Sequence, residues 1–171
     1  MFWEGFLKLG STRENKDKSA FLKKISGISF AENSIGDVVG KLTFSFKYFD
    51  NSQDAGQDFR DWNQKQLYEL LDKLKEYSKQ TQLYWHNQRC GKGSLNVLEY
   101  YDSFPENTDF TYPGHVPDNV RWSRFRMESA VRLIGFFIYP EMARENPKLS
   151  EDTFYVVFLD RDHRFYKKEK R

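Results

Sequence analysis

The sequence predicts an α+β domain in which a long amphipathic helix packs on one face of a mostly antiparallel sheet. Three observations support this class: a strand-like alternation at residues 42–48, a helical stripe over 58–79, and three strand-like segments between 120 and 166. A helix on one face of a largely antiparallel sheet defines the α+β class. At 171 residues the chain can bury a core in one domain, which we assign to residues 40–171, preceded by an N-terminal extension, 1–39.

Composition excludes several classes of protein. Aromatic residues make up 18% of the chain, which is typical of a folded domain and not of a disordered one. The single cysteine, Cys90, excludes an internal disulfide framework, and with three His the sequence predicts no zinc site and no cofactor. No apolar run reaches the length of a membrane span, and the N-terminus lacks the pattern of a signal peptide. We therefore expect a cytoplasmic protein without a membrane partner.

The first clear element is a strand that follows the N-terminal extension. Between residues 42 and 48, apolar side chains alternate strictly with polar ones, with Leu42, Phe44, Phe46 and Tyr48 on one face. This period of two predicts a half-buried strand. The polar cluster at 50–56 predicts a turn after it.

A long helix is predicted over residues 58–79. Apolar residues recur there at spacings of three and four, while most charged residues lie off this stripe. The stripe is most simply the face that packs on the sheet. It comprises Phe59, Trp62, Leu67, Leu70, Leu71, Leu74 and Tyr77.

The segment between the helix and the last strands is irregular. Residues 89–93 form a basic loop punctuated by glycine, which lacks the Gly-Lys-Ser/Thr order of a phosphate-binding P-loop. Residues 95–101 fit either a short strand or a short helix. Three prolines and a glycine in 103–119 predict a long surface loop, and loops of this length are often functional.

Three strands are predicted in the C-terminal part, at 120–129, at 130–139 and from residue 153 onward, with a tight turn near 129–130. Residues 160–171 hold six Lys or Arg against three Asp or Glu, although the net charge of the whole chain is only +2. A polyanion would therefore bind at a local basic patch. Four arginines interrupt the first two of these apolar strands: Arg121, Arg124, Arg126 and Arg132.

This order of elements, with a handful of residues, resembles the RelE/YoeB/HigB group of bacterial toxins. The residues are Trp122-Ser123-Arg124, Arg132 in the next strand, and His163-Arg164-Phe165-Tyr166 after the last strand. The resemblance covers residues 41–166 and implies a RelE-like core carrying an N-terminal extension. It further implies an endoribonuclease that cleaves messenger RNA, typically in the ribosomal A site, and that a partner antitoxin silences. The extension, the 103–119 loop and an insertion at 140–152 have no counterpart in that group.

The resemblance also implies roles for single residues. Arg132 stands where the group places an arginine near the scissile phosphate, with Arg161 or Arg164 as a second phosphate-binding arginine. His163 and Tyr166 resemble the pair that serves in proton transfer and base stacking. Lys92 lies where the group has a basic loop that faces RNA. Either Glu128 or Glu99 would correspond to the general-base glutamate.

Elementary chemistry supports part of this assignment. Cleavage of RNA without a metal requires a base for the 2′-hydroxyl proton, an acid for the leaving oxygen and a cation at the phosphate. His163 is the best candidate for proton transfer, because its ordinary pKa lies near neutrality. Trp122 beside Arg124 and Arg126 on one strand face suits stacking a base and binding a phosphate. In a regular strand Tyr166 faces away from His163, so the two converge only if the chain bends.

Other interpretations fit the same residues. Arg124 and Arg126 also suit the solvated side of a sheet, paired with Glu128, and His163 suits an ordinary strand end. A non-catalytic module that binds RNA or protein would use the same arginines. A third function is that of ParE-like toxins, which act on a DNA topoisomerase, and this function predicts toxicity that survives His163→Ala.

Overall fold

The computed structural model describes residues 40–91, 93–101, 103–127 and 131–167. The N-terminal extension, Lys92 and Glu128 lie outside the described residues, so the predictions made for them stay predictions. The described part is an α+β structure with a five-stranded sheet in the order β1-β5-β4-β3-β2. The strands are β1 (Thr43–Ser45), β2 (Leu98–Tyr100), β3 (Arg121–Arg126), β4 (Arg132–Phe137) and β5 (Thr153–Asp160).

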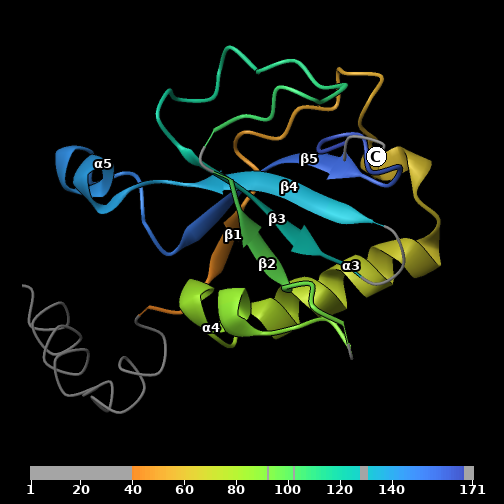
Figure 1. Ribbon diagram of the computed structural model, residues 1–171, viewed down its shortest axis with the longest axis horizontal. Helices are drawn as coiled ribbons and strands as arrows, with labels where there is room; N and C mark the ends of the chain where they lie inside the picture. The colour runs from red at the N-terminus through yellow and green to blue at the C-terminus, as the bar shows by residue number, and fades with distance from the viewer. Residues whose placement is uncertain (1–39, 92, 102, 128–130, 168–171) are drawn as a thin grey trace, which may run out of the picture. The chain divides into compact units, whose positions relative to one another are not determined.

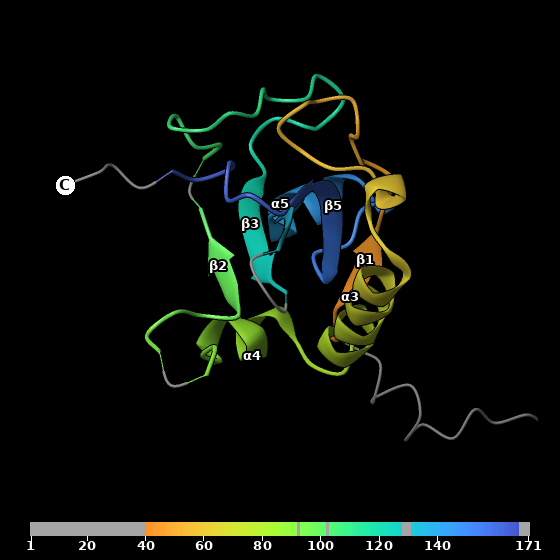
Figure 2. The same cartoon turned by 90° about the vertical axis from the view of Figure 1, so that its right-hand side faces the viewer.

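The sheet is mixed. β2, β3, β4 and β5 pair with their neighbours in antiparallel fashion, whereas β1 pairs in parallel with β5 at one edge of the sheet. Figure 2 shows β2 and β1 at opposite edges. The sequence prediction of a mostly antiparallel sheet is corrected at this edge, because a period of two gives a strand's faces but not its direction or its partner. Within residues 95–101, the strand alternative is adopted by Leu98–Tyr100, which form β2.

The single helix predicted over 58–79 is replaced by two shorter elements. A 3-10 turn, η1 (Phe59–Asp61), is followed by the 14-residue helix α3 (Gln64–Tyr77). The Asn63 side chain accepts a hydrogen bond from the Gln66 amide and caps the N-terminus of α3. Asparagine is favoured at this capping position and disfavoured inside a helix. Two further short helices, α4 (Gln82–Asn87) and α5 (Pro140–Glu145), lie in segments where no helix was assigned.

Hydrophobic clusters cover both faces of the sheet. On one face, Leu70 and Tyr77 of α3 and Trp85 of α4 pack with Phe125 of β3. On the other face, the 103–119 loop contributes Phe110 and Val116 to a second cluster. Figure 1 shows α3 and α4 below the sheet and this loop above it. Leu71, predicted on the buried stripe of the helix, is 61% exposed.

A β-bulge at the centre of the sheet requires glycine. Ile134 pairs with Phe158 while Gly135 pairs with Val156, so β5 holds one extra residue at this point. A Cβ on Gly135 would lie 2.2 Å from the carbonyl oxygen of Tyr155 and 2.8 Å from the Phe154 ring. Neither neighbour can retreat without moving the backbone of β5.

No helix in the described part is both long enough and apolar enough to span a bilayer.

Gly135→Ala is expected to lower the free energy of unfolding by roughly 2–3 kcal/mol, because the added methyl group overpacks the core. Gly114→Ala is the matched control, since a Cβ at Gly114 meets no atom within 4 Å. This control should change stability by less than about 0.5 kcal/mol. Urea unfolding followed by circular dichroism measures both values. Equal midpoints for the two variants would contradict the tight packing at the bulge.

Candidate anion-binding site

Three arginines converge on one face of the sheet because of strand register. Arg126 of β3 lies opposite Arg132 of β4, and Arg132 lies opposite Asp160 of β5. Since directly opposed residues share a face, Arg126, Arg132 and Asp160 form one row, and Arg124 points to the same side two residues along β3. The intervening Phe125 stacks on Tyr77 of α3, so the arginines lie on the face away from that helix.

The arginines line a cavity of about 510 Å³. A narrower recess adjoins it and shares Arg124, Arg132, His163 and Tyr166 with it, adding Tyr101 and Asp160. The structure therefore brings together five of the residues singled out in the sequence. The cavity is lined by Leu95, Arg124, Arg126, Arg132, His163, Tyr166 and Lys167.

Backbone carbonyls hold two of the guanidinium groups in place. Arg126 Nε donates to the Asn96 carbonyl at 2.9 Å, and Arg132 Nη1 donates to the Val131 carbonyl at 2.9 Å. Both residues are only 8% exposed. Burial and the neighbouring guanidinium groups lower the pKa of each, yet arginine stays protonated in proteins. The result is fixed positive charge in a partly desolvated cavity, where it attracts an anion more strongly than at an open surface.

Arg124 has unused hydrogen-bonding capacity. Its Nε is buried and has no hydrogen-bond partner in the part of the chain that the structure describes. Its guanidinium lies over the Tyr101 ring, 5.7 Å from the centroid. Neither Arg124 nor Arg126 forms an ion pair with a carboxylate among the described residues. A bound anion would satisfy donors that the described residues leave open.

A turn after β5 brings His163 and Tyr166 to the same cavity. The buried carboxylate of Asp160 accepts hydrogen bonds from the amides of Arg164, at 2.9 Å, and Phe165, at 3.0 Å. His163 adopts a left-handed backbone conformation, with φ of 59°, and Phe165 is buried in the core. This turn is the bend that convergence of the two side chains requires. Regular strand geometry from Asp160 onward would have kept them apart.

The cavity lowers the pKa of His163. Burial is the main cause and the charge of Arg132 the next, while the Asp160 carboxylate opposes them. A pKa below the usual value of about 6.5 leaves the imidazole mostly neutral at pH 7. A neutral imidazole can accept a proton from a bound hydroxyl group.

Sequence reasoning missed Tyr101 and left Glu99 undecided. Tyr101 stacks on Tyr166 with 5.4 Å between ring centroids, and its buried hydroxyl has no hydrogen-bond partner among the described residues. Burial raises the pKa of Tyr101 to about 12, so the hydroxyl keeps its proton. Glu99 lies opposite Arg124 in the β2–β3 pair and therefore on the face of the arginines. To place Tyr101 and Glu99 at the cavity, one must know which strands pair, and hydrophobic periodicity in the sequence does not give that pairing.

Three of the predicted RNA-binding residues do not line this cavity. Trp122 is 1% exposed and packs among Phe104, Phe158 and Phe165, so it is a core residue on the same face. Arg161 is exposed, and its Nε lies 3.3 Å from the Asp162 carboxylate. Arg164 donates to Asp109 and to the Asp54 carbonyl, both at 3.0 Å.

Lys167, which belongs to the basic segment 160–171, also lines the cavity. Its ammonium also pairs with Asp109, the carboxylate that Arg164 contacts. Lys167 thus places a further positive charge beside the three arginines.

Among the described residues, no group of three or more His, Cys, Asp or Glu side chains is arranged to hold a metal ion. Comparisons of the chain with protein-family models, with curated proteins and with solved structures find no match.

Proposed function

We propose that this protein is a metal-independent endoribonuclease with a RelE-like core, which cleaves messenger RNA at the ribosome and which an antitoxin protein silences. The observation that carries the proposal is the convergence of three guanidinium groups with His163 and Tyr166 in one cavity. Fixed cations suit the phosphodiester, and an adjacent imidazole suits proton transfer.

The proposed reaction is a transesterification at phosphorus. The ribose 2′-oxygen attacks the adjacent phosphorus, a 2′-O–P bond forms and the P–O5′ bond breaks. The products are a 2′,3′-cyclic phosphate and a free 5′-hydroxyl end. The 2′-hydroxyl proton passes to a base, and the leaving 5′-oxygen takes a proton from an acid. Arg124, Arg126 and Arg132 stabilise the negative charge that grows on the non-bridging oxygens.

In this proposal His163 is the base, because its lowered pKa favours the neutral imidazole at pH 7. Tyr166, exposed beside the same cavity, supplies the proton for the leaving oxygen, and the stacked Tyr101 and Tyr166 rings offer a platform for a base. Glu99 is the alternative base. In that arrangement His163 would act as the acid, and the pH dependence of cleavage would have the opposite sign.

Inducible expression in bacteria tests the function. We expect wild-type protein to arrest growth and to produce discrete new 5′-hydroxyl ends in cellular RNA, and the double variant Arg132→Ala, His163→Ala to do neither. Arg161→Ala is the matched control, since this arginine lies off the cavity and its loss should leave both effects intact. Normal growth with intact RNA on wild-type expression would refute the nuclease. Arrest without cleavage that survives His163→Ala would favour a ParE-like or binding function.

A further inference from the structure

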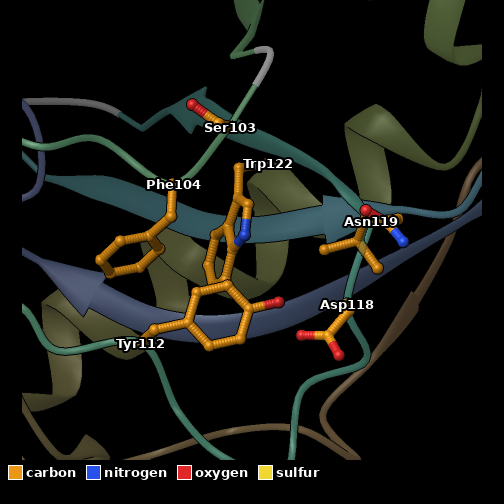
Figure 3. A pocket seen from close by; sticks show the side chains of 7 residues that line it. Ser103, Phe104, Tyr112, Asp118, Asn119 and Trp122 are labelled. Carbon is orange, nitrogen blue, oxygen red and sulfur yellow. The ribbon is translucent and has the colours of Figure 1, made fainter.

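A second cavity, of about 600 Å³, lies near the start of β3 and shares no residue with the arginine cavity. Figure 3 shows its lining, in which the rings of Phe104, Tyr112 and Trp122 lie on one side and Asp118 and Asn119 on the other. Its volume falls in the usual range for small-molecule sites, about 300–1,000 Å³. The residues used below are Ser103, Phe104, Tyr112, Asp118, Asn119 and Trp122.

Three aromatic rings meet at steep angles in this wall. The Phe104 and Trp122 centroids are 4.9 Å apart at 75°, those of Tyr112 and Trp122 5.6 Å apart at 73°, and those of Phe104 and Tyr112 5.3 Å apart at 63°. Trp122 is only 1% exposed, so the partly buried rings of Phe104 and Tyr112, which pack against it, supply most of the aromatic surface of the cavity. Aromatic surface of this kind attracts cations, above all ammonium groups that carry methyl groups.

The polar side of the cavity is acidic. The 103–119 loop holds Glu106, Asp109 and Asp118 and contains no Lys or Arg. Asp109 is neutralised by Arg164 and Lys167. Asp118 lines the cavity and forms no ion pair within the described part of the chain. Its negative charge at the cavity therefore has no positive partner among the described residues.

Local backbone geometry fixes the polar groups. Asn119 has a left-handed φ of 58°, a conformation that asparagine adopts more readily than most residues, and Figure 3 shows Asp118 and Asn119 on the rim across from the rings. The Tyr112 hydroxyl donates to the Pro117 carbonyl at 2.8 Å. Figure 3 shows the Tyr112 hydroxyl pointing to the side on which Asp118 lies, and burial, together with the charge of Asp118, raises the pKa of Tyr112.

We propose that this cavity binds a small organic cation whose methylated or alkylated ammonium group lies between the aromatic wall and the Asp118 carboxylate. Asp118 is exposed to solvent, so its carboxylate repels an anion and attracts a cation, while a neutral ligand gains nothing from its charge. Ser103 and Asn119 offer hydrogen bonds to the remainder of the ligand. The proposal does not depend on the nuclease activity, because the two cavities share no lining residue.

Isothermal titration with choline and with its neutral isostere 3,3-dimethylbutanol tests this site. Choline should bind at least about fivefold more tightly, since the two ligands share a shape and differ in charge. Asp118→Asn should weaken choline binding by about fivefold to tenfold. Tyr112→Phe should weaken it less than Tyr112→Leu, which removes the ring. Glu106→Gln, which changes an exposed acid of the same loop outside the cavity, should bind choline as wild type does.

Amide spectra locate the bound ligand, and choline should shift the signals of Ser103, Asp118 and Asn119. The same head group occurs on trimethyllysine side chains, so a trimethyllysine peptide forms a second arm, and whichever ligand binds more tightly identifies the source. Arg132→Ala should retain choline binding, which separates this site from the nuclease proposal. Absent binding of both cations, equal affinity for choline and the alcohol, or an unchanged affinity in Asp118→Asn would overturn the inference.

Discussion

Arg132→Ala is expected to lower kcat/KM for RNA cleavage by about 10²–10³-fold, as does the loss of one fixed donor from an oxyanion site. The guanidinium is buried and tied to the Val131 carbonyl, so in the proposed reaction it need not reorganise as charge develops on the phosphate. Arg132→Lys should recover only part of the activity, because an ammonium lacks the planar pair of donors. Purified variants and a labelled oligoribonucleotide provide the measurement, with KM and kcat separated.

The controls for this prediction use other arginines of the chain. Arg161→Ala should cleave at the wild-type rate, since this residue is exposed beside Asp162 and lies off the cavity. Arg124→Ala provides a second cavity variant in case Arg132→Ala unfolds. Thermal melts show whether each variant remains folded. Retention of full activity in both cavity variants, with folding intact, would rule out the arginine cavity as the catalytic site.

His163→Ala is expected to lower kcat by about 10²–10⁴-fold and to remove the acidic limb of the pH–rate profile. The base must be neutral to accept a proton, so wild-type activity should rise with pH through the pKa of His163. Burial and Arg132 hold that pKa below its ordinary value, which places the limb below about pH 6.5 and a plateau at neutral pH. Arg124→Gln removes a positive charge that lowers this pKa and should move the limb to higher pH.

Imidazole titration by nuclear magnetic resonance checks the same pKa without reference to activity. The His163 signal, identified by its loss in His163→Ala, should titrate below pH 6.5 in wild-type protein and at higher pH in Arg124→Gln. A profile in which activity falls as pH rises through this pKa would instead assign His163 as the acid and favour Glu99 as the base. A pH-independent rate would remove His163 from proton transfer altogether.

The sequence by itself determined the local features of this protein. Period-two alternation located the first strand, although only Thr43–Ser45 of the predicted 42–48 forms it, with Leu42 and Tyr48 in different core clusters. Apolar runs located the three C-terminal strands, because side-chain burial on a pleated strand follows the chain directly. Arg124, Arg126 and Arg132 stood out because charged side chains are costly within apolar strands. His163 was selected as the candidate for proton transfer because the ordinary pKa of histidine lies near neutrality.

Only the tertiary structure decided which of these residues meet. Register set Arg126 beside Arg132 and Glu99 beside Arg124, and it placed Trp122 in the core under the 103–119 loop. The Asp160 carboxylate accepts hydrogen bonds from two backbone amides and so stabilises the turn that brings His163 and Tyr166 to the arginines. These outcomes depend on hydrogen bonds and packing between residues distant in the chain, which local periodicity does not encode. The parallel β1–β5 edge is hidden from the sequence for the same reason.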